Sequence, residues 1–147
     1  MRAAGVELPE TPSPVAAYVS ATVAAGFVYT AGQIPRVDGE LISPGRVGED
    51  VSVEQARAAA ERGALQAISA IKSVATDLDR VERIVKLTVF VRSAPGFTGQ
   101  PAVADGASTL FQQVFGEAGK HARSAVGVAE LPLGSCVEVE VVARLRD

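Results

Sequence analysis

The sequence predicts an α+β chain in which two helices pack on one face of a mixed β-sheet. Two observations carry this prediction. From Cys136 to Leu145 every second residue, from Val137 onward, is apolar and most of the residues between them are polar, which is typical of a strand with one buried face. A capping box opens at Ser52, and small apolar residues follow it at helical spacing, as in a helix that lies close on a sheet. With 147 residues, the chain is expected to form one domain, residues 1–147.

The first part of the chain is expected to form an extended arm followed by strands. Residues 1–14 contain three prolines, which exclude a helix and favour extended backbone. The patterns of residues 18–28 and 27–34 predict two strands joined by a turn. Asp38-Gly39 is a strong turn signal, and a further short strand is expected near residues 40–42.

Two helices and one strand are expected in the middle of the chain. The first helix runs from its N-cap Ser52, which Gln55 completes as a capping box, to about Thr76. A turn and then a strand are predicted over residues 81–91. Residues 93–106 are rich in glycine and proline and are expected to be loose. The second helix is expected to begin at Val103 or Ala107, to end at Phe115, and to be stopped by the glycines that follow.

The last two strands are expected to pair as an antiparallel hairpin, because Pro132 and Gly134 supply turn residues between them. In that hairpin Arg123 and Glu138 lie roughly opposite each other, on the face that is not aliphatic. An arginine binds a carboxylate through two parallel hydrogen bonds, and a glutamate activates a water or delivers a proton. The pair is therefore a candidate site for a small carboxylate substrate. The alternative is that the two charges only pair with each other across the strands.

Composition excludes several classes of function. The formal net charge of −3 argues against a nucleic-acid partner. A single cysteine, Cys136, excludes an intramolecular disulfide and a cysteine-based zinc site. The N-terminus lacks the pattern of a secretory signal, and no apolar run reaches the roughly 18 residues of a membrane helix. A soluble, cytoplasmic protein without a membrane partner is expected.

Four segments of the chain match one family in the same order. They are PVAAYV at residues 14–19, YTAGQIP at 29–35, KLTVFV at 86–91 and RSAVGVAELPLGSCVEVE at 123–140. In these segments the chain resembles the Rid (YjgF) family, the reactive enamine/imine deaminases. The resemblance implies a chorismate-mutase-like fold and a homotrimer with active clefts between neighbouring subunits. It also implies hydrolysis of 2-enamino or 2-imino acids to 2-oxo acids and ammonia, without a metal or organic cofactor.

The same resemblance assigns roles to individual residues. Arg123 corresponds to the family's carboxylate-binding arginine, and Glu138 corresponds to its catalytic glutamate. Gly32 matches the glycine whose backbone N–H approaches the substrate, and Tyr18 matches the tyrosine that lines the cleft. Glu140 shares the strand face of Glu138 and is the alternative assignment for the catalytic carboxylate.

Two positions depart from the family pattern. Ala125 stands where many members have a cysteine that helps to shape the pocket. The asparagine-containing second helix aligns poorly, around Ser108, because residues 93–106 are longer than usual. The sheet face that bears Ala125, Gly127 and Cys136 is expected to be buried between subunits.

Other interpretations exist for the function of the trimer and for the roles of two residues. The same trimer could bind an acidic metabolite without turnover, whereas a ribonuclease is disfavoured by the acidic charge balance. His121 is either an additional acid or base near Arg123 or, as we favour, a structural connector that bonds to backbone. Cys136 is expected to be a small buried residue rather than a nucleophile.

Overall fold

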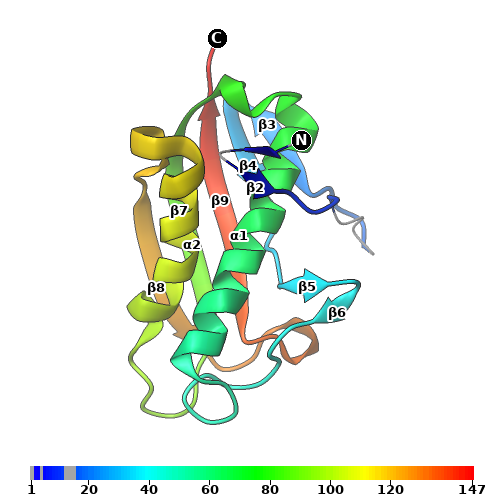
Figure 1. Ribbon diagram of the computed structural model, residues 1–147. Coiled ribbons are helices and arrows are strands. Elements are labelled where there is room, and N and C mark those ends of the chain that lie inside the picture. Colours follow the sequence, from blue (N-terminus) through cyan, green and yellow to red (C-terminus); the bar gives the residue numbers. More distant parts are fainter. Residues whose placement is uncertain (1, 4, 12–15) are drawn as a thin grey trace.

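The core of the fold is a five-stranded sheet with the strand order β3-β4-β9-β7-β8 (Figure 1). The computed structural model describes residues 2–3, 5–11 and 16–147. The strands of this sheet are β3 Ala21–Ala24, β4 Phe27–Thr30, β7 Val81–Arg92, β8 Ala122–Val128 and β9 Val137–Leu145. Only β7 and β8 are parallel, so the sheet is mixed as predicted.

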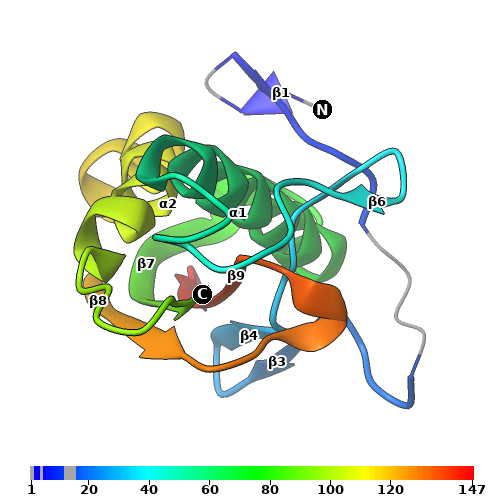
Figure 2. The same cartoon turned by 90° about the horizontal axis from the view of Figure 1, so that it is seen from below.

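Two helices, α1 Val53–Ala75 and α2 Gln100–Phe115, lie side by side on one face of the sheet (Figure 2). The capping box of Ser52 and Gln55 starts α1 as the sequence predicts. Small residues allow close packing: a Cβ on Gly63 would lie 2.9 Å from Cγ2 of Val139 in β9. The core of the described chain therefore lies between the two helices and the sheet face that they cover.

Helix α2 begins several residues before the predicted start, so residues 100–106 are helical rather than loose. Its N-cap is Gly99, and Pro101 lies in the first turn. Proline is tolerated there because an N–H in the first turn has no partner within the helix. The predicted end at Phe115 is confirmed, and a 3₁₀ turn at Gly116–Gly119 follows it.

The predicted hairpin between the last two strands is wrong. Among the described strands, β8 pairs only with β7, in parallel, and β7-α2-β8 forms a crossover unit at the edge of the sheet. Strand β9 lies in the centre, antiparallel to both β4 and β7. Residues 129–136, which include a 3₁₀ turn at Pro132–Gly134, carry the chain from the edge to this central place. A tight turn would have forced neighbouring strands, whereas this connection spans β7.

The pairing registers place residues on the two faces of the sheet. Arg123 is level with Leu87, a core residue, and its side chain contacts α2, so it lies on the helix face. Glu138 is level with Phe90, three residues along β7, and lies on the opposite, open face. The expectation that Arg123 and Glu138 share the non-aliphatic face is therefore wrong, and they do not pair with each other.

The N-terminal arm is extended, as predicted, within the residues that the structure describes. It contains the short antiparallel pair β1 Arg2–Ala3 and β2 Val6–Glu7. Pro9 lies in this arm, whereas Pro12 and Pro14 lie outside the described residues. A second small hairpin, β5 Arg36–Val37 and β6 Glu40–Leu41, turns at Asp38-Gly39 as the sequence predicts.

The first two predicted strands are too long at their outer ends. Strand β3 begins only at Ala21, so residues 18–20 are not in the sheet. Strand β4 ends at Thr30, so residues 31–34 are not part of a strand, and Gln33 pairs with Val139 through an isolated bridge. In the described residues, no helix is long and apolar enough to cross a membrane.

Candidate functional site

Glu138 is a half-buried carboxylate near the middle of the open sheet face. Strand β9 positions it, because alternation along this strand buries Val137 and Val139 and turns Glu138 the other way. Burial raises its pKa above the usual value of 4.5, and the neighbouring charge of Glu140 raises the pKa further. Among the described residues, its carboxylate has no hydrogen-bond or ion-pair partner. Such a group holds a proton more readily than an exposed glutamate.

Gly32 lies against the side chain of Glu138. A Cβ at Gly32 would overlap Oε2 of Glu138 and would lie 2.7 Å from its Cδ. The backbone is held here by Gln33, whose N–H donates to the Val139 carbonyl at 2.8 Å and whose carbonyl accepts from the Val139 N–H. Only glycine therefore leaves room for the carboxylate in this position, and the structure brings Gly32 and Glu138 together.

Arg123 belongs to a second group of polar side chains, at the edge of the sheet beneath α2. Its Nη1 donates to Oδ1 of Asp105 at 2.7 Å and to Oγ of Ser108 at 3.1 Å. The arginine side chain is 25% exposed and the Asp105 side chain is 53% exposed, so this ion pair is open to solvent. Ser108 is buried, and α2 places it one turn after Asp105 on the same side of the helix.

Ala125 lies two residues after Arg123 on the same face of β8 and packs partly against the core. Its position and that of Gly127, which is level with Val91, differ from the predicted intersubunit face: both lie on the helix side of the sheet. Cys136 is also buried, within the core of its own chain. The three residues therefore do not share an open face of the sheet, as was expected of them.

Tyr18 precedes β3 and is 54% exposed. Its only hydrogen bond in the described residues runs from its N–H to the Ala16 carbonyl. In the described residues, no hydrogen bond links Tyr18 to Glu138 or to Arg123.

Sequence reasoning missed Asp105, the ion-pair partner of Arg123. It fell in a stretch expected to be loose, although Asp105 and Ser108 are spaced three residues apart, as neighbours on one side of a helix are. A predicted helix that began at the proline in the first turn of α2 would have placed Asp105 and Ser108 on one side of the helix.

His121 and Cys136 have structural surroundings. The His121 ring packs edge-on against Phe111 with 6.0 Å between ring centroids, and its Nδ1 lies 3.3 Å from the Ala122 carbonyl. Burial lowers the pKa of His121, which favours the neutral imidazole. Burial raises the pKa of the Cys136 thiol to about 11, so the nucleophilic thiolate is scarce at neutral pH.

No three His, Cys, Asp or Glu side chains in the described part of the chain come together as a group that could hold a metal ion. Two groups of candidate residues lie on opposite faces of the sheet: Glu138 with Gly32, and Arg123 with Asp105 and Ser108. A model of the family described as "YjgF/chorismate_mutase-like, putative endoribonuclease" matches residues 1–145. The chain belongs to the YjgF family.

Known YjgF relatives are similar over most of the chain. Protein TCP17 of Trypanosoma cruzi is 44% identical over 144 residues, which cover 97% of this chain and 90% of that protein. A 2-iminobutanoate/2-iminopropanoate deaminase of Salmonella typhimurium is 35% identical over 132 residues, which cover 90% of each chain. The crystal structure of a protein of unknown function from Agrobacterium tumefaciens superposes with a TM-score of 0.88 at 39% identity, covering 91% of this chain and 86% of that one.

Proposed function

We propose that this YjgF protein, acting as a single domain of residues 1–147, hydrolyses 2-imino and 2-enamino acids to 2-oxo acids and ammonia. In this proposal Arg123 binds the substrate carboxylate, and Glu138 accepts a proton and then returns it. The proposal is supported by the similarity to a protein named as a 2-iminobutanoate/2-iminopropanoate deaminase. The observation that carries it is Glu138, a half-buried carboxylate with a raised pKa that packs over Gly32.

The chemistry needs one water and one group that both accepts and returns a proton. Water attacks C2 of the protonated imine while Glu138 takes a proton from the water, which forms a tetrahedral amino alcohol. Glu138 then returns the proton to the nitrogen. The C–N bond breaks, ammonia leaves, and the hydroxyl proton is released as the 2-oxo acid forms. A carboxyl with a raised pKa suits both steps, because its ionised form accepts a proton more readily than an exposed glutamate does and its protonated form can give that proton back.

We propose that two copies of the chain build one site, which the positions of Arg123 and Glu138 support. Within one chain these residues lie on opposite faces of the sheet, and they cannot contact the same small substrate. In the proposed assembly, the Arg123 group at the sheet edge, with Ser108 and Ala125, faces the Glu138 and Gly32 group of a neighbour. We propose that Tyr18, which is exposed at the end of the arm, lines the same cleft.

The open face of the sheet is the surface that we propose to be covered in a homotrimer. It carries Tyr29 and Val126, which are 45% and 42% exposed, beside Phe90 and Val142. Exposed apolar side chains gathered on one face are typical of an interface between subunits.

We expect sedimentation equilibrium to give three times the chain mass of 15.1 kDa. A Val126→Asp variant should dissociate into smaller species, because the charge would be buried in the interface. Val23→Asp, at an exposed site on the helix side of edge strand β3, is the matched control. A parent protein that remains monomeric at micromolar concentration would contradict the shared site.

The activity itself is tested by ammonia release. An imino acid is generated in place by an amino-acid oxidase, and its decay is followed with and without the purified protein. Faster release of ammonia and 2-oxo acid supports the deaminase. Binding of a 2-oxo acid without faster release would replace it with the non-catalytic binding function.

Asp105 should compete with the substrate for Arg123. We expect Asp105→Asn to lower KM for an imino-acid carboxylate about fivefold, because asparagine keeps a hydrogen-bond acceptor but removes a charge pair worth about 1 kcal/mol. The control is Glu61→Gln, an exposed charge on α1. A rise in KM would instead show that Asp105 holds Arg123 in its working position.

A further inference from the structure

A cavity lies beside α1, on the side of the N-terminal arm and the β5-β6 hairpin. It has a volume of about 460 Å³ and lies between the N-terminal arm, α1 and the β5-β6 hairpin. Its charged lining residues are Glu10, Arg36, Asp38 and Arg62. Cavities of this size accommodate small organic ligands. None of these residues belongs to the Arg123 or Glu138 group.

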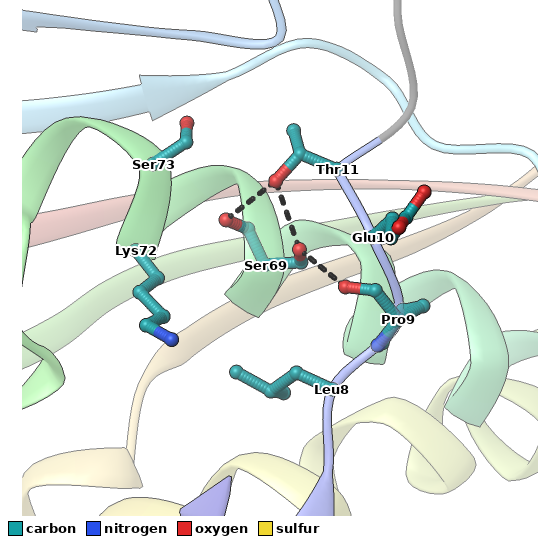
Figure 3. Close-up of a pocket in the computed structure, with 7 residues that line it drawn as sticks. All are labelled: Leu8, Pro9, Glu10, Thr11, Ser69, Lys72 and Ser73. Carbon is teal, nitrogen blue, oxygen red and sulfur yellow. Dashed lines mark hydrogen bonds between the residues drawn. The ribbon is translucent and has the colours of Figure 1, made fainter. Parts of the chain in front are cut away.

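The arm that forms one wall is held on α1 by side-chain hydrogen bonds. Ser69 Oγ donates to the Pro9 carbonyl at 2.7 Å, and Thr11 Oγ1 donates to the Ser69 carbonyl at 3.1 Å (Figure 3). Figure 3 also shows that Glu10 projects to the far side of the arm from Lys72. Hydrogen bonds at Pro9 and Thr11 therefore fix this wall of the cavity on both sides of Glu10.

The two arginines are held in place by backbone carbonyls rather than by acidic partners. Arg62 Nε donates to the Arg36 carbonyl at 2.7 Å, and Arg36 Nη1 donates to the Gly39 carbonyl at 3.3 Å. Buried Gln66 accepts from the Arg36 N–H at 2.8 Å and so ties the hairpin to α1. Within the described residues, neither guanidinium forms an ion pair. Each half-buried arginine therefore keeps a charge that no described acidic side chain neutralises.

Acidic side chains lie nearer to solvent in the same cavity. Glu10 and Asp38 are exposed, whereas Arg36 and Arg62 are half-buried. Asp38 is fixed by the turn, where its φ of 52° and the φ of 81° at Gly39 are typical of a type I′ turn. Neither carboxylate forms an ion pair with the arginines in this part of the structure. The cavity therefore presents inner positive charges and outer negative charges.

We propose that this cavity binds a small zwitterion of the α-amino acid class. The ligand carboxylate binds the N–H groups of Arg36 and Arg62, and the ligand ammonium group faces Glu10 and Asp38. A simple anion would meet the same arginines but would be repelled by the two outer carboxylates. A simple cation would lack the inner partners. The site is separate from the proposed catalytic residues, so it stands or fails independently of the deaminase activity.

The test compares three ligands of similar size on the ¹⁵N-labelled full chain. L-Alanine carries both charges, propionate only the negative one and ethylamine only the positive one. We expect L-alanine to shift the amide signals of Arg36, Val37 and Gly39 in a saturable way, with affinity at least about fivefold above that of either other ligand. The titration is repeated in an Arg123→Gln background, which removes binding at the proposed carboxylate anchor.

Charge variants separate the two ends of the site. Arg62→Gln should weaken L-alanine binding about tenfold, whereas Arg57→Gln, at an exposed position of the same helix, should leave it unchanged. Glu10→Gln should weaken L-alanine binding and strengthen propionate binding, each about two- to threefold, because it removes only the outer charge. Glu10 is exposed, so this variant is expected to fold whether or not Arg62→Gln does.

The proposal is overturned by either of two results. One is the absence of saturable shifts at the hairpin amides up to about 50 mM L-alanine. The other is equal affinity for propionate and L-alanine, which would make the cavity a plain anion site.

Discussion

Glu138→Gln is expected to lower turnover of 2-imino acids about 100- to 10,000-fold, the usual contribution of a general acid or base. Glutamine keeps the shape that packs over Gly32 but can neither accept nor return a proton. Binding of the product 2-oxo acid should remain, because the proposed carboxylate anchor is elsewhere. The measurements are kcat from oxidase-coupled ammonia release and Kd for a 2-oxo acid by calorimetry.

Glu140→Gln is the matched control, since Glu140 lies two residues along the same strand face. It should keep most of the activity. If Glu140→Gln is inactive and Glu138→Gln is active, the catalytic carboxylate has been assigned to the wrong residue of this strand. In the parent protein, kcat should rise with pH through the raised pKa of Glu138, because the first step needs its carboxylate form.

The raised pKa of Glu138 also has a consequence for stability. Burial makes the folded chain hold this proton more tightly than the unfolded chain, whose pKa is near 4.5. Stability therefore falls as pH rises from about 4.5 through the folded-state pKa, and the loss persists above it. Glu138→Gln removes the charge that burial disfavours, so its melting temperature at pH 7 should equal or exceed that of the parent.

Arg123→Ala is expected to weaken binding of 2-oxo and 2-imino acid carboxylates by about 2–5 kcal/mol, which is roughly 30-fold or more. Arg123→Lys should recover only part of this loss, because an ammonium group cannot form the two parallel hydrogen bonds of a guanidinium. The measurements are Kd for a 2-oxo acid and KM for an imino acid on both variants.

Because the ion-pair partner of Arg123 is exposed, an effect of Arg123→Ala on ligand binding can be told apart from an effect on stability. Its partner Asp105 is exposed, so loss of the arginine leaves a carboxylate that water can solvate. The melting temperature of Arg123→Ala should therefore stay close to the parental value. A folded variant of parental stability that still binds 2-oxo acids would contradict the anchor role. A strongly destabilised variant would show that Arg123 is mainly structural.

Some elements of this fold follow from local sequence. The start of α1 is set by Ser52 and Gln55, whose side chains bond to backbone groups within the same turn. The turn at Asp38-Gly39 depends on the tolerance of these two residues for positive φ. Strand β9 and its buried face follow from alternation, since successive side chains point to opposite faces of a sheet. With the family resemblance, these features were enough to predict the fold class and to select Glu138 and Arg123.

The tertiary structure decided how these elements combine. Alternation shows that β9 has a buried face, but it does not show which strands lie beside it. The short strand β8 has small side chains on both faces, so its pattern does not determine which face meets the helices. The crossover through α2 settles both points, because it places β8 parallel to β7 and turns Arg123 toward Asp105. The placement of Arg123 and Glu138 on opposite faces thus depends on long-range packing, which no local pattern encodes.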